Sequence, residues 1–217
     1  MRRTVRPELL DTGEVTPEER RKSLDDLRFV NRWFGGTTTS VSILDRVVAR
    51  EQRTLTLLDV GSATGDTATR IQKQFDVRCT LLDRVPSHFN GASARFTCVA
   101  ADALSLPFHD SSFDVVSCSL FAHHLEPDAL VHFANEALRV SRTALLINDL
   151  RRSYLHLALI YAGMPLYRSR ATRHDSIASV QRAYTPADLA QMLKRSRARS
   201  VEIHRTYLCR MGAIAWK

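Results

Sequence analysis

The sequence predicts a three-layer α/β fold, in which helices cover both faces of a seven-stranded, mostly parallel sheet. The first observation is that short apolar runs alternate with helix-like segments through the middle of the chain, which is typical of parallel sheets. The second is a pair of closely spaced strand-like runs at residues 201–208 and 211–217, which predicts an antiparallel hairpin at the sheet's edge. A chain of 217 residues, 44% of them hydrophobic, is long enough for one such domain.

The residues before the first strand predict added N-terminal helices. Thr16 can cap a helix, Pro17 suits its first turn, and Glu19 completes a capping box. This helix is expected to end at Gly35–Gly36, and a second helix is expected over residues 40–50. We therefore interpret residues 1–53 as a helical extension or lid.

Strands and helices then alternate along the rest of the chain. Strands are expected at residues 54–60, 79–84, 96–100, 113–120 and 144–150, with helices at 66–75 and 128–140. A capped helix that starts at Thr185 comes before the terminal hairpin. Residues 54–217 are thus expected to form one ligand-binding domain, with an insert at about 151–184 between the fifth and sixth strands.

The net charge of +8 is concentrated in the last third of the chain. Residues 151–217 contain 13 lysines and arginines against three acids, whereas residues 1–150 have a net charge of −2. This distribution predicts a phosphate-bearing or polyanionic partner, or a membrane surface. The alternative is that the arginines only solvate exposed helix faces.

Several features favour a cytoplasmic location. No apolar run is long enough to span a bilayer, and the N-terminus lacks the apolar region of a secretory signal. The four cysteines are far apart and lack metal-binding spacing, so we expect them to be reduced core residues.

The segment LLDVGSATGD (57–66) places an acid and several small residues directly after the first buried strand. In open parallel sheets, ligands bind at the carboxyl ends of the strands, and small residues let backbone N–H groups approach them. A dinucleotide fingerprint would need glycine where the sequence has Ala63 and Asp66, and a P-loop would need a Gly-Lys-Ser/Thr run. The remaining candidate is a nucleoside ligand without phosphates.

Two acids at later strand ends fit such a nucleoside. Asp83 ends the second strand, where a carboxylate can accept from both ribose hydroxyls, and Asp102 follows the third, where an acid can accept from an adenine amino group. Ribose, adenine and an uncharged linker describe S-adenosylmethionine (SAM). The segments LLDVGSATGD, LLDR (81–84), AADALSLPFHDSSFDVVSCSL (100–120) and EALRV (136–140) resemble the class I SAM-dependent methyltransferases, and the UbiE/COQ5-like group in particular.

The resemblance implies a Rossmann-like methyltransferase fold, with SAM as the cofactor. It also implies that the loop after the first strand wraps the methionine part of SAM. The ends of the second and third strands would hold the ribose and adenine, and the end of the fourth would border the sulfonium. The residues so assigned are, in that order, Asp59, Gly61, Ser62, Ala63 and Gly65; Asp83 and Arg84; Asp102 and Ala103; and Ser119 and Leu120.

His123 and His124 follow the fourth strand, beside the expected position of the sulfonium. Methyl transfer to a hydroxyl or a carbon acid needs a base with a pKa near neutrality, and histidine is the side chain best suited to that role. The alternative is that the pair caps or packs the next helix. Because adjacent residues point about 100° apart on a helix, we expect only one ring to face the sulfonium, and we favour His123.

The same segment excludes some acceptors. SLFAHH (119–124) has neither the Pro-Pro-Tyr/Phe motif of enzymes that methylate amino groups of DNA bases nor the Pro-Cys nucleophile of cytosine C5 enzymes. Asn148 and Asp149 follow the fifth strand, but the sequence offers no convincing partners for them, so we expect no metal.

The insert at 151–184 is expected to set the acceptor specificity. If its apolar part forms a helix, nearly every face of that helix is apolar, so we expect another surface to cover it. It is interpreted either as a core or dimer helix, or as the wall of a lipophilic acceptor pocket with a basic mouth. In the second interpretation, Arg32, Trp33 and Phe34 close the cofactor side, and the substrate contacts are Trp33, Arg152, Leu155, Leu159, Met164 and His174.

The leading hypothesis is SAM-dependent methyl transfer to an oxygen or carbon of a lipophilic small molecule, aromatic or polyketide-like in type. An anionic or carrier-bound acceptor and a peripheral membrane contact both stay open, and so does the oligomeric state. The first alternative is an RNA methyltransferase that uses the basic last third, although this region lacks the interleaved aromatics of single-strand binders. The second alternative is a SAM-binding regulator without catalysis.

Overall fold

The computed structural model describes residues 1–12, 15–33, 35–51, 53–89, 91–207 and 209–217. Its strands are β1 (Leu55–Val60), β2 (Val77–Asp83), β3 (Thr97–Ala100), β4 (Phe113–Ser119), β5 (Ser141–Leu150), β6 (Ser200–Tyr207) and β7 (Arg210–Trp216). Its helices are α1 (Leu9–Thr12), α2 (Pro17–Trp33), α3 (Gly36–Val48), α4 (Asp66–Gln72), α5 (Pro127–Val140), α6 (Tyr154–Gly163), α7 (Arg170–Arg182) and α8 (Pro186–Lys194). Three short 3-10 helices are η1 (Pro86–Phe89), η2 (Ala122–His124) and η3 (Met164–Leu166).

The strands form a seven-stranded sheet in the order β3-β2-β1-β4-β5-β7-β6. Strands β1 to β5 are parallel, whereas β7 runs antiparallel to both β5 and β6. The predicted three-layer fold with a terminal antiparallel hairpin is therefore confirmed. The strand order reverses between β1 and β4, and such a switch point leaves the loop after β1 open to a ligand.

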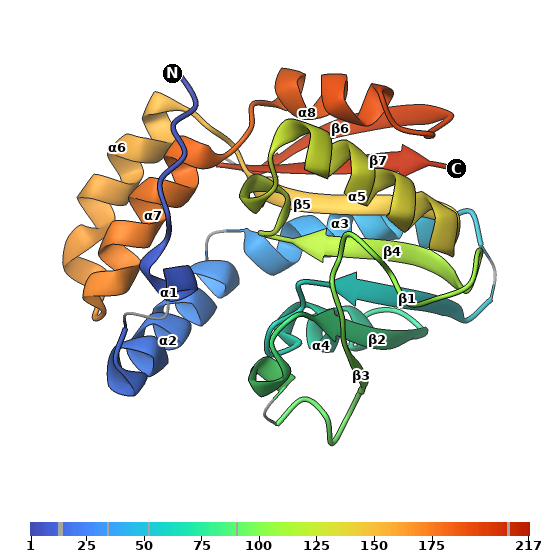
Figure 1. Cartoon of the computed structure of the whole chain (residues 1–217), viewed down its shortest axis with the longest axis horizontal. Coiled ribbons are helices and arrows are strands. Elements are labelled where there is room, and N and C mark those ends of the chain that lie inside the picture. The colour runs from blue at the N-terminus through green and yellow to red at the C-terminus, as the bar shows by residue number, and fades with distance from the viewer. Residues whose placement is uncertain (13–14, 34, 52, 90, 208) are drawn as a thin grey trace.

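The strands read as continuous apolar runs because helices cover both faces of the sheet (Figure 1). In β1, Leu58 and Val60 belong to the core under α5 and α8, while Leu55 and Leu57 belong to the core under α3 and α4. All four side chains are at most 1% exposed. Full burial of such side chains contributes about 1.5–3 kcal/mol each, so these two cores hold the sheet together.

Helix α3 begins four residues before the predicted start at residue 40. Its first turn contains Thr37, Thr38 and Thr39, which are poor helix formers by intrinsic propensity. Tertiary packing overrides that propensity, because Thr39 is buried and its hydroxyl lies 2.8 Å from the hydroxyl of Thr206 in β6.

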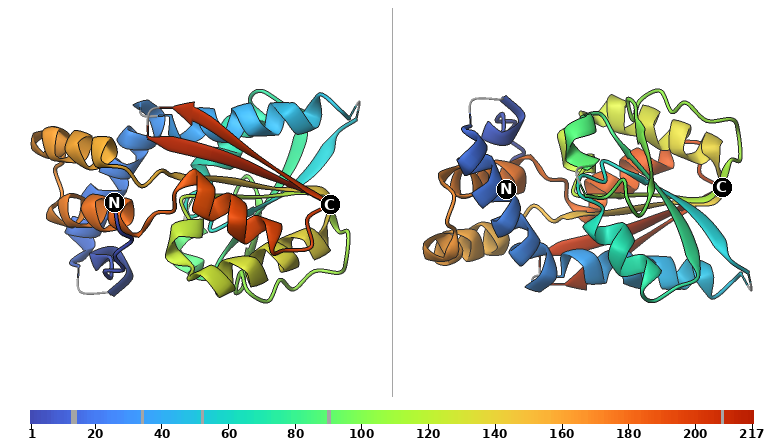
Figure 2. Two further views of the ribbon diagram at one scale, coloured as in Figure 1. Left: turned by 90° about the horizontal axis from the view of Figure 1, so that it is seen from above. Right: turned by 90° about the horizontal axis from the view of Figure 1, so that it is seen from below.

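Helices α1, α2, α6 and α7 gather at one end of the molecule, at the left of Figure 1, and both views in Figure 2 show the same grouping. Buried carboxylates join these segments. Asp26 of α2 accepts hydrogen bonds from the N–H groups of Arg168 and Ser169, and Asp175 of α7 accepts from those of Leu9 and Leu10. The N-terminal residues and the insert therefore form one cap, which contacts η2 just after β4.

The expectation that the apolar insert helix is buried is met by the described residues on one face only. His156 and Ile160 of α6 are buried, but Tyr154, Leu155 and Tyr161 are at least half exposed. The reason is that α6 lies on the outside of the cap, where α7 covers one of its faces. No helix of the described residues is both long enough and apolar enough to cross a membrane.

We expect Asp114, at the start of β4, to make stability sensitive to acid. Its carboxylate is 1% exposed, pairs with Arg53 and Arg142 at 2.8 and 3.2 Å, and accepts from the N–H and hydroxyl of Thr56. Burial alone would raise the pKa of Asp114, but these bonds outweigh it and hold the pKa well below its ordinary range. The hydrogen bond from Arg53 has the largest lowering effect on the pKa, followed by those from Thr56 and Arg142. Both arginines are about half exposed, so solvent screens their contribution to stability.

Asp114→Asn should lower the free energy of unfolding by about 3 kcal/mol at pH 7. The folded pKa lies below the unfolded one, so the contribution of Asp114 is complete above the unfolded pKa of about 3.9 and is lost as the pH falls further. Urea unfolding of both proteins from pH 7 to pH 3 measures this. A difference between them that stays constant over that range would contradict the prediction.

Candidate functional site

The loop after β1 folds back against the end of β2. The N–H groups of Gly61 and Ser62 donate to the carbonyl of Leu82 at 2.8 and 3.2 Å. Gly61 has a φ of 66°, and a Cβ at this position would lie 3.0 Å from the ring of Phe121. Only glycine fits both the backbone angle and the close approach, so this tight loop explains the small residues in the sequence.

Asp59 lies at the base of this loop. It is 1% exposed and accepts a hydrogen bond from Ser117 Oγ at 2.8 Å. Burial raises the pKa of its carboxyl to about 7, against the opposing effect of the Ser117 hydroxyl. A cationic ligand group nearby would favour the charged carboxylate, which suits the ammonium of a methionine moiety.

Asp83 joins the end of β2 to the same loop. Its carboxylate accepts from the N–H groups of Ala63 and Val85, both at 3.0 Å, and lies 3.1 Å from Nδ1 of His88. Burial alone would raise the pKa of Asp83, but these partners outweigh it and lower the pKa below its usual value. Asp83 is therefore a fixed carboxylate, which both orders the loop and retains acceptor capacity for a ligand.

The end of β4 is held by a buried polar network. Leu120 has a φ of 55°, uncommon for a residue other than glycine, and its N–H donates to the carbonyl of Asn148 at 2.8 Å. Nδ2 of Asn148 donates to the carbonyl of Gly36 and to Ser40 Oγ at 2.7 and 2.8 Å, and Ser40 Oγ lies 2.9 Å from Ser119 Oγ. The start of α3 is thus fixed to the ends of β4 and β5.

These strand ends and the first helices enclose a cavity of about 200 Å³. A separate cavity of about 400 Å³, lined by α3 and β6, contains none of the strand-end residues and therefore lacks the chemistry of the loop. The residues that line the first cavity are Leu24, Leu27, Arg28, Asn31 and Gly36 from α2 and α3; Asp59, Gly61, Ser62, Ala63, Thr64, Asp66 and Thr67 from β1, the loop and α4; and Ser119, Leu120 and Asn148 from the ends of β4 and β5.

The structure brings only part of the predicted cofactor set together in this cavity. Gly65, with a φ of 72°, forms the end of the loop before α4, and Asp83 holds the loop from outside the lining. Arg84 is exposed, Asp102 is exposed and accepts from the N–H of Leu104 at 2.8 Å, and Ala103 is buried in the core. The assignments of all these residues to the cofactor stay predictions.

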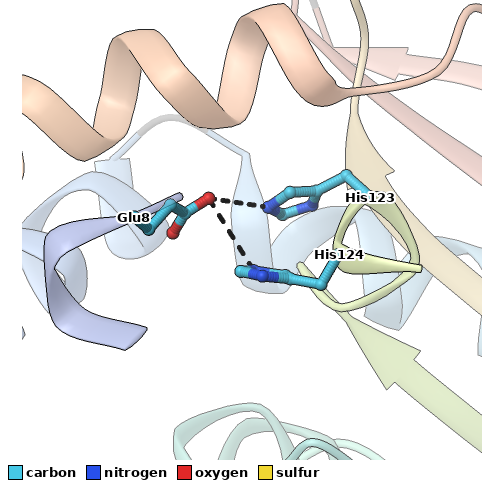
Figure 3. Close-up of side chains that lie close together, drawn as sticks. All are labelled: Glu8, His123 and His124. Carbon is cyan, nitrogen blue, oxygen red and sulfur yellow. Dashed lines mark ion pairs between the residues drawn. The ribbon is translucent and has the colours of Figure 1, made fainter. Parts of the chain in front are cut away.

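His123 and His124 converge on a carboxylate that the sequence analysis missed. Oε1 of Glu8, from the N-terminal segment, lies 3.6 Å from Nε2 of His123 and 3.9 Å from Nε2 of His124 (Figure 3). The two rings lie 4.3 Å apart and are tilted by 37°. The premise that the two rings point about 100° apart, as adjacent residues of an α-helix do, is therefore wrong, while the expectation that one ring faces the sulfonium stays a prediction. They sit in η2 rather than in a regular α-helix, and both face Glu8.

His123 is held from both sides. Its Nδ1 lies 2.6 Å from Oδ1 of Asp149, and its N–H donates to Oδ2 of the same residue at 2.9 Å. Burial alone would lower the pKa of His123, but the carboxylates of Asp149 and Glu8 outweigh it and raise the pKa to about 9. A raised pKa does not suit the predicted role of a free base near neutrality.

The predicted acceptor contacts are distributed over the cap. Arg152 pairs with Asp188 at 2.9 Å and donates to the carbonyl of Ala183, so its guanidinium is committed to the start of α8. Leu155 and Leu159 lie on the exposed face of α6, Met164 is half-buried in η3, and exposed His174 pairs with Asp175. The side chains of Arg32 and Trp33, and the whole of Phe34, lie outside the described residues.

Glu8, Ser40, Asn31 and His88 belong to this region but were not found from the sequence. Each of these residues reaches the site through a contact with a distant segment of the chain, or through a turn that has no recognisable sequence motif. The Glu8 carboxylate, for example, accepts from Ser179 Oγ in α7 at 2.6 Å, and no local pattern in the N-terminal residues indicates that contact.

Comparisons with known proteins agree with this geometry. Residues 57–144 match a protein-family model described as a methyltransferase domain. The plantazolicin methyltransferase BpumL, solved in complex with SAH, is similar to this chain with a TM-score of 0.71 and 15% identity, over 97% of this chain and 94% of that one. A SAM-dependent methyltransferase from Aquifex aeolicus has a TM-score of 0.61 and 14% identity, over 91% of this chain and 97% of that one. The trans-methyltransferase CalH, also solved with SAH, has a TM-score of 0.58 and 17% identity, over 80% of this chain and 54% of that one.

The matched segment runs from the middle of β1 into β5, and so includes the loop, Asp83 and the end of β4. The similar structures share the fold of this chain. Two of the three were solved with SAH, which is what remains of SAM after it gives up its methyl group. Residues 57–144 therefore match a methyltransferase domain, and the chain has the fold of SAM-dependent methyltransferases; both findings support SAM-dependent methyl transfer as its activity.

Proposed function

We propose that this enzyme transfers a methyl group from SAM to an oxygen or carbon atom of a lipophilic small molecule, aromatic or polyketide-like in type. We also place it in the UbiE/COQ5-like group, on the motifs quoted above. The observation that carries the proposal is the cap. Helices α2 and α3 contribute residues to the cofactor cavity, while α6 of the same cap presents apolar side chains such as Leu155 and Tyr161.

The reaction is an in-line displacement at the sulfonium methyl. A lone pair or carbanion of the acceptor forms the new bond to the methyl carbon, and sulfur keeps the electron pair of the broken S–C bond, which yields SAH. The acceptor's proton leaves to a base or to water. The enzyme's contribution is to align the two reactants and exclude water, and the end of β4, with Ser119 and Leu120, would border the sulfonium.

The cap residues are expected to select the acceptor. We propose that residues 1–53 act as a lid over the cofactor, and that the insert at about 151–184 contacts the acceptor. No residue of α6 lines the cofactor cavity, but an apolar compound or a second apolar surface would remove its exposed apolar face from water, and this is the support that α6 gives to a lipophilic ligand.

No observation specifically favours an RNA acceptor. Several basic side chains of the last third are committed inside the protein and not presented to phosphates. Arg152 pairs with Asp188, Arg182 donates to the carbonyl of His124, and Arg210 is 2% exposed and donates to Asn31.

Calorimetric titration of the purified protein with SAM, SAH and NAD tests the proposal. We expect SAM and SAH to bind one per chain, and NAD not to bind. A mass spectrum of the protein as purified would show whether a lipophilic compound accompanies it. Failure to bind SAM or SAH, or tight binding of NAD instead, would overturn the proposed function.

A further inference from the structure

The cluster formed by Glu8, His123 and His124 lies beside the cofactor cavity, but binding SAM does not require it. His123 comes three residues after Leu120, which lines that cavity. One ligand atom from each member of the cluster lies within 4.8 Å of the other two, and Glu8 and His123 are buried. Figure 3 shows both imidazole rings directed at the same carboxylate.

The ligand atoms of the cluster lie at ion-pair distances from one another. The separations of 3.6 and 3.9 Å between Glu8 and the two rings are too long for direct hydrogen bonds. Around a divalent ion with bonds of about 2.0–2.2 Å, neighbouring ligand atoms lie about 3–3.5 Å apart. The two measured pairs are within about 0.5 Å of that spacing, and the atoms of the third pair are at most 4.8 Å apart.

The surroundings orient two of the three groups. Asp149 binds Nδ1 of His123 at 2.6 Å, which directs Nε2 toward Glu8. A carboxylate behind a histidine in this way is the usual support for a metal-binding imidazole, because it fixes the ring and makes it more basic. On the other side, Ser179 Oγ donates to Oε1 of Glu8 at 2.6 Å and fixes that carboxylate.

The geometry points to a metal site: we propose that Glu8, His123 and His124 bind one divalent ion of the zinc, cobalt or iron(II) type, with Asp149 as the positioning residue. Two imidazoles and one carboxylate are donors that these ions prefer, whereas magnesium and calcium prefer oxygen ligands. The expectation from sequence was that no metal binds, because Glu8 is brought to the histidines only by the fold.

Such an ion would have a direct use in methyl transfer, and this part of the inference rests on the proposed function. Three protein ligands leave room for a further ligand, as in catalytic zinc sites. An acceptor hydroxyl bound there would lose its proton to water near neutral pH, and its oxygen would then attack the sulfonium methyl. The acceptor atom would therefore be an oxygen rather than a carbon.

Metal binding can be measured without knowing the acceptor. Untagged full-length protein, freed of metal by a chelator, is titrated with Zn²⁺ by calorimetry and with Co²⁺ by visible absorbance. We expect one ion per chain. Glu8→Gln and His124→Ala should each weaken Zn²⁺ binding at least tenfold, and Asp149→Asn should weaken it by about 10- to 100-fold. Millimolar Mg²⁺ should not displace the ion.

Matched controls are available on the surface. His132→Ala and Glu18→Gln remove an exposed histidine and an exposed carboxylate outside the cluster, and both should bind Zn²⁺ like the unmutated protein. SAH binding, measured on every variant, shows that each one is folded. Absence of Zn²⁺ and Co²⁺ binding by a protein that binds SAH would overturn the metal site alone. Unchanged binding in Glu8→Gln and His124→Ala would also overturn it, because the ion would then lie elsewhere.

Discussion

Asp83→Ala is expected to weaken SAM binding by about 10- to 150-fold, since a charge-assisted hydrogen bond to a buried carboxylate contributes about 1.5–3 kcal/mol. The structure adds a second reason for a large effect. Asp83 holds the N–H of Ala63 at 3.0 Å, so its loss also releases the loop that shapes the cavity. Calorimetric titration of SAM into both proteins gives the ratio of dissociation constants.

Asp45→Ala is the matched control, because Asp45 is an exposed carboxylate on α3 and does not line the cavity. Its SAM affinity should equal that of the unmutated protein. Asp83→Asn separates the two effects, since an amide can still accept from backbone N–H groups but carries no charge. Equal SAM affinity in Asp83→Ala and the unmutated protein would remove Asp83 from the cofactor site.

His123→Ala is expected to lower turnover by about a hundredfold or more, with SAM affinity nearly unchanged. In the proposed metal site His123 is a ligand and not a free base, and loss of a group that activates the nucleophile costs about a hundredfold or more in rate. His123 is placed for such a role because it follows the end of β4, lies against Asp149 and faces Glu8. The cofactor cavity itself is lined by other residues, so the SAM dissociation constant should stay the same.

Turnover is followed as SAH release in the presence of an acceptor found by mass spectrometry or by screening. His132→Ala serves as the control, because it removes an exposed imidazole that is bonded to the carbonyl of Leu104. His124→Ala tests the second ring of the pair. Full turnover in both His123→Ala and His124→Ala would show that alignment of the reactants is sufficient for catalysis.

The sequence by itself determined the sheet and the loop that follows its first strand. The apolar runs of β1 to β5 are local features, and parallel strands between helices leave few alternatives for their arrangement. The small residues between Asp59 and Asp66 are also a local feature, and they indicated the loop. Only glycine permits a backbone φ of 66° at position 61 beside the ring of Phe121. Helix boundaries also depend on tertiary packing. The early start of α3 follows from the packing of Thr39 and not from helix propensity.

Only the tertiary structure decided what surrounds the two histidines and which face of the insert meets water. Glu8, His123, Asp149 and Ser179 come from four separate parts of the chain, and their meeting depends on how the cap packs against the ends of β4 and β5. Hydrophobic periodicity cannot report this, because it records which residues are buried and not which partners they find. The same limit applies to α6, whose apolar sequence predicted burial although Tyr154 is 72% exposed.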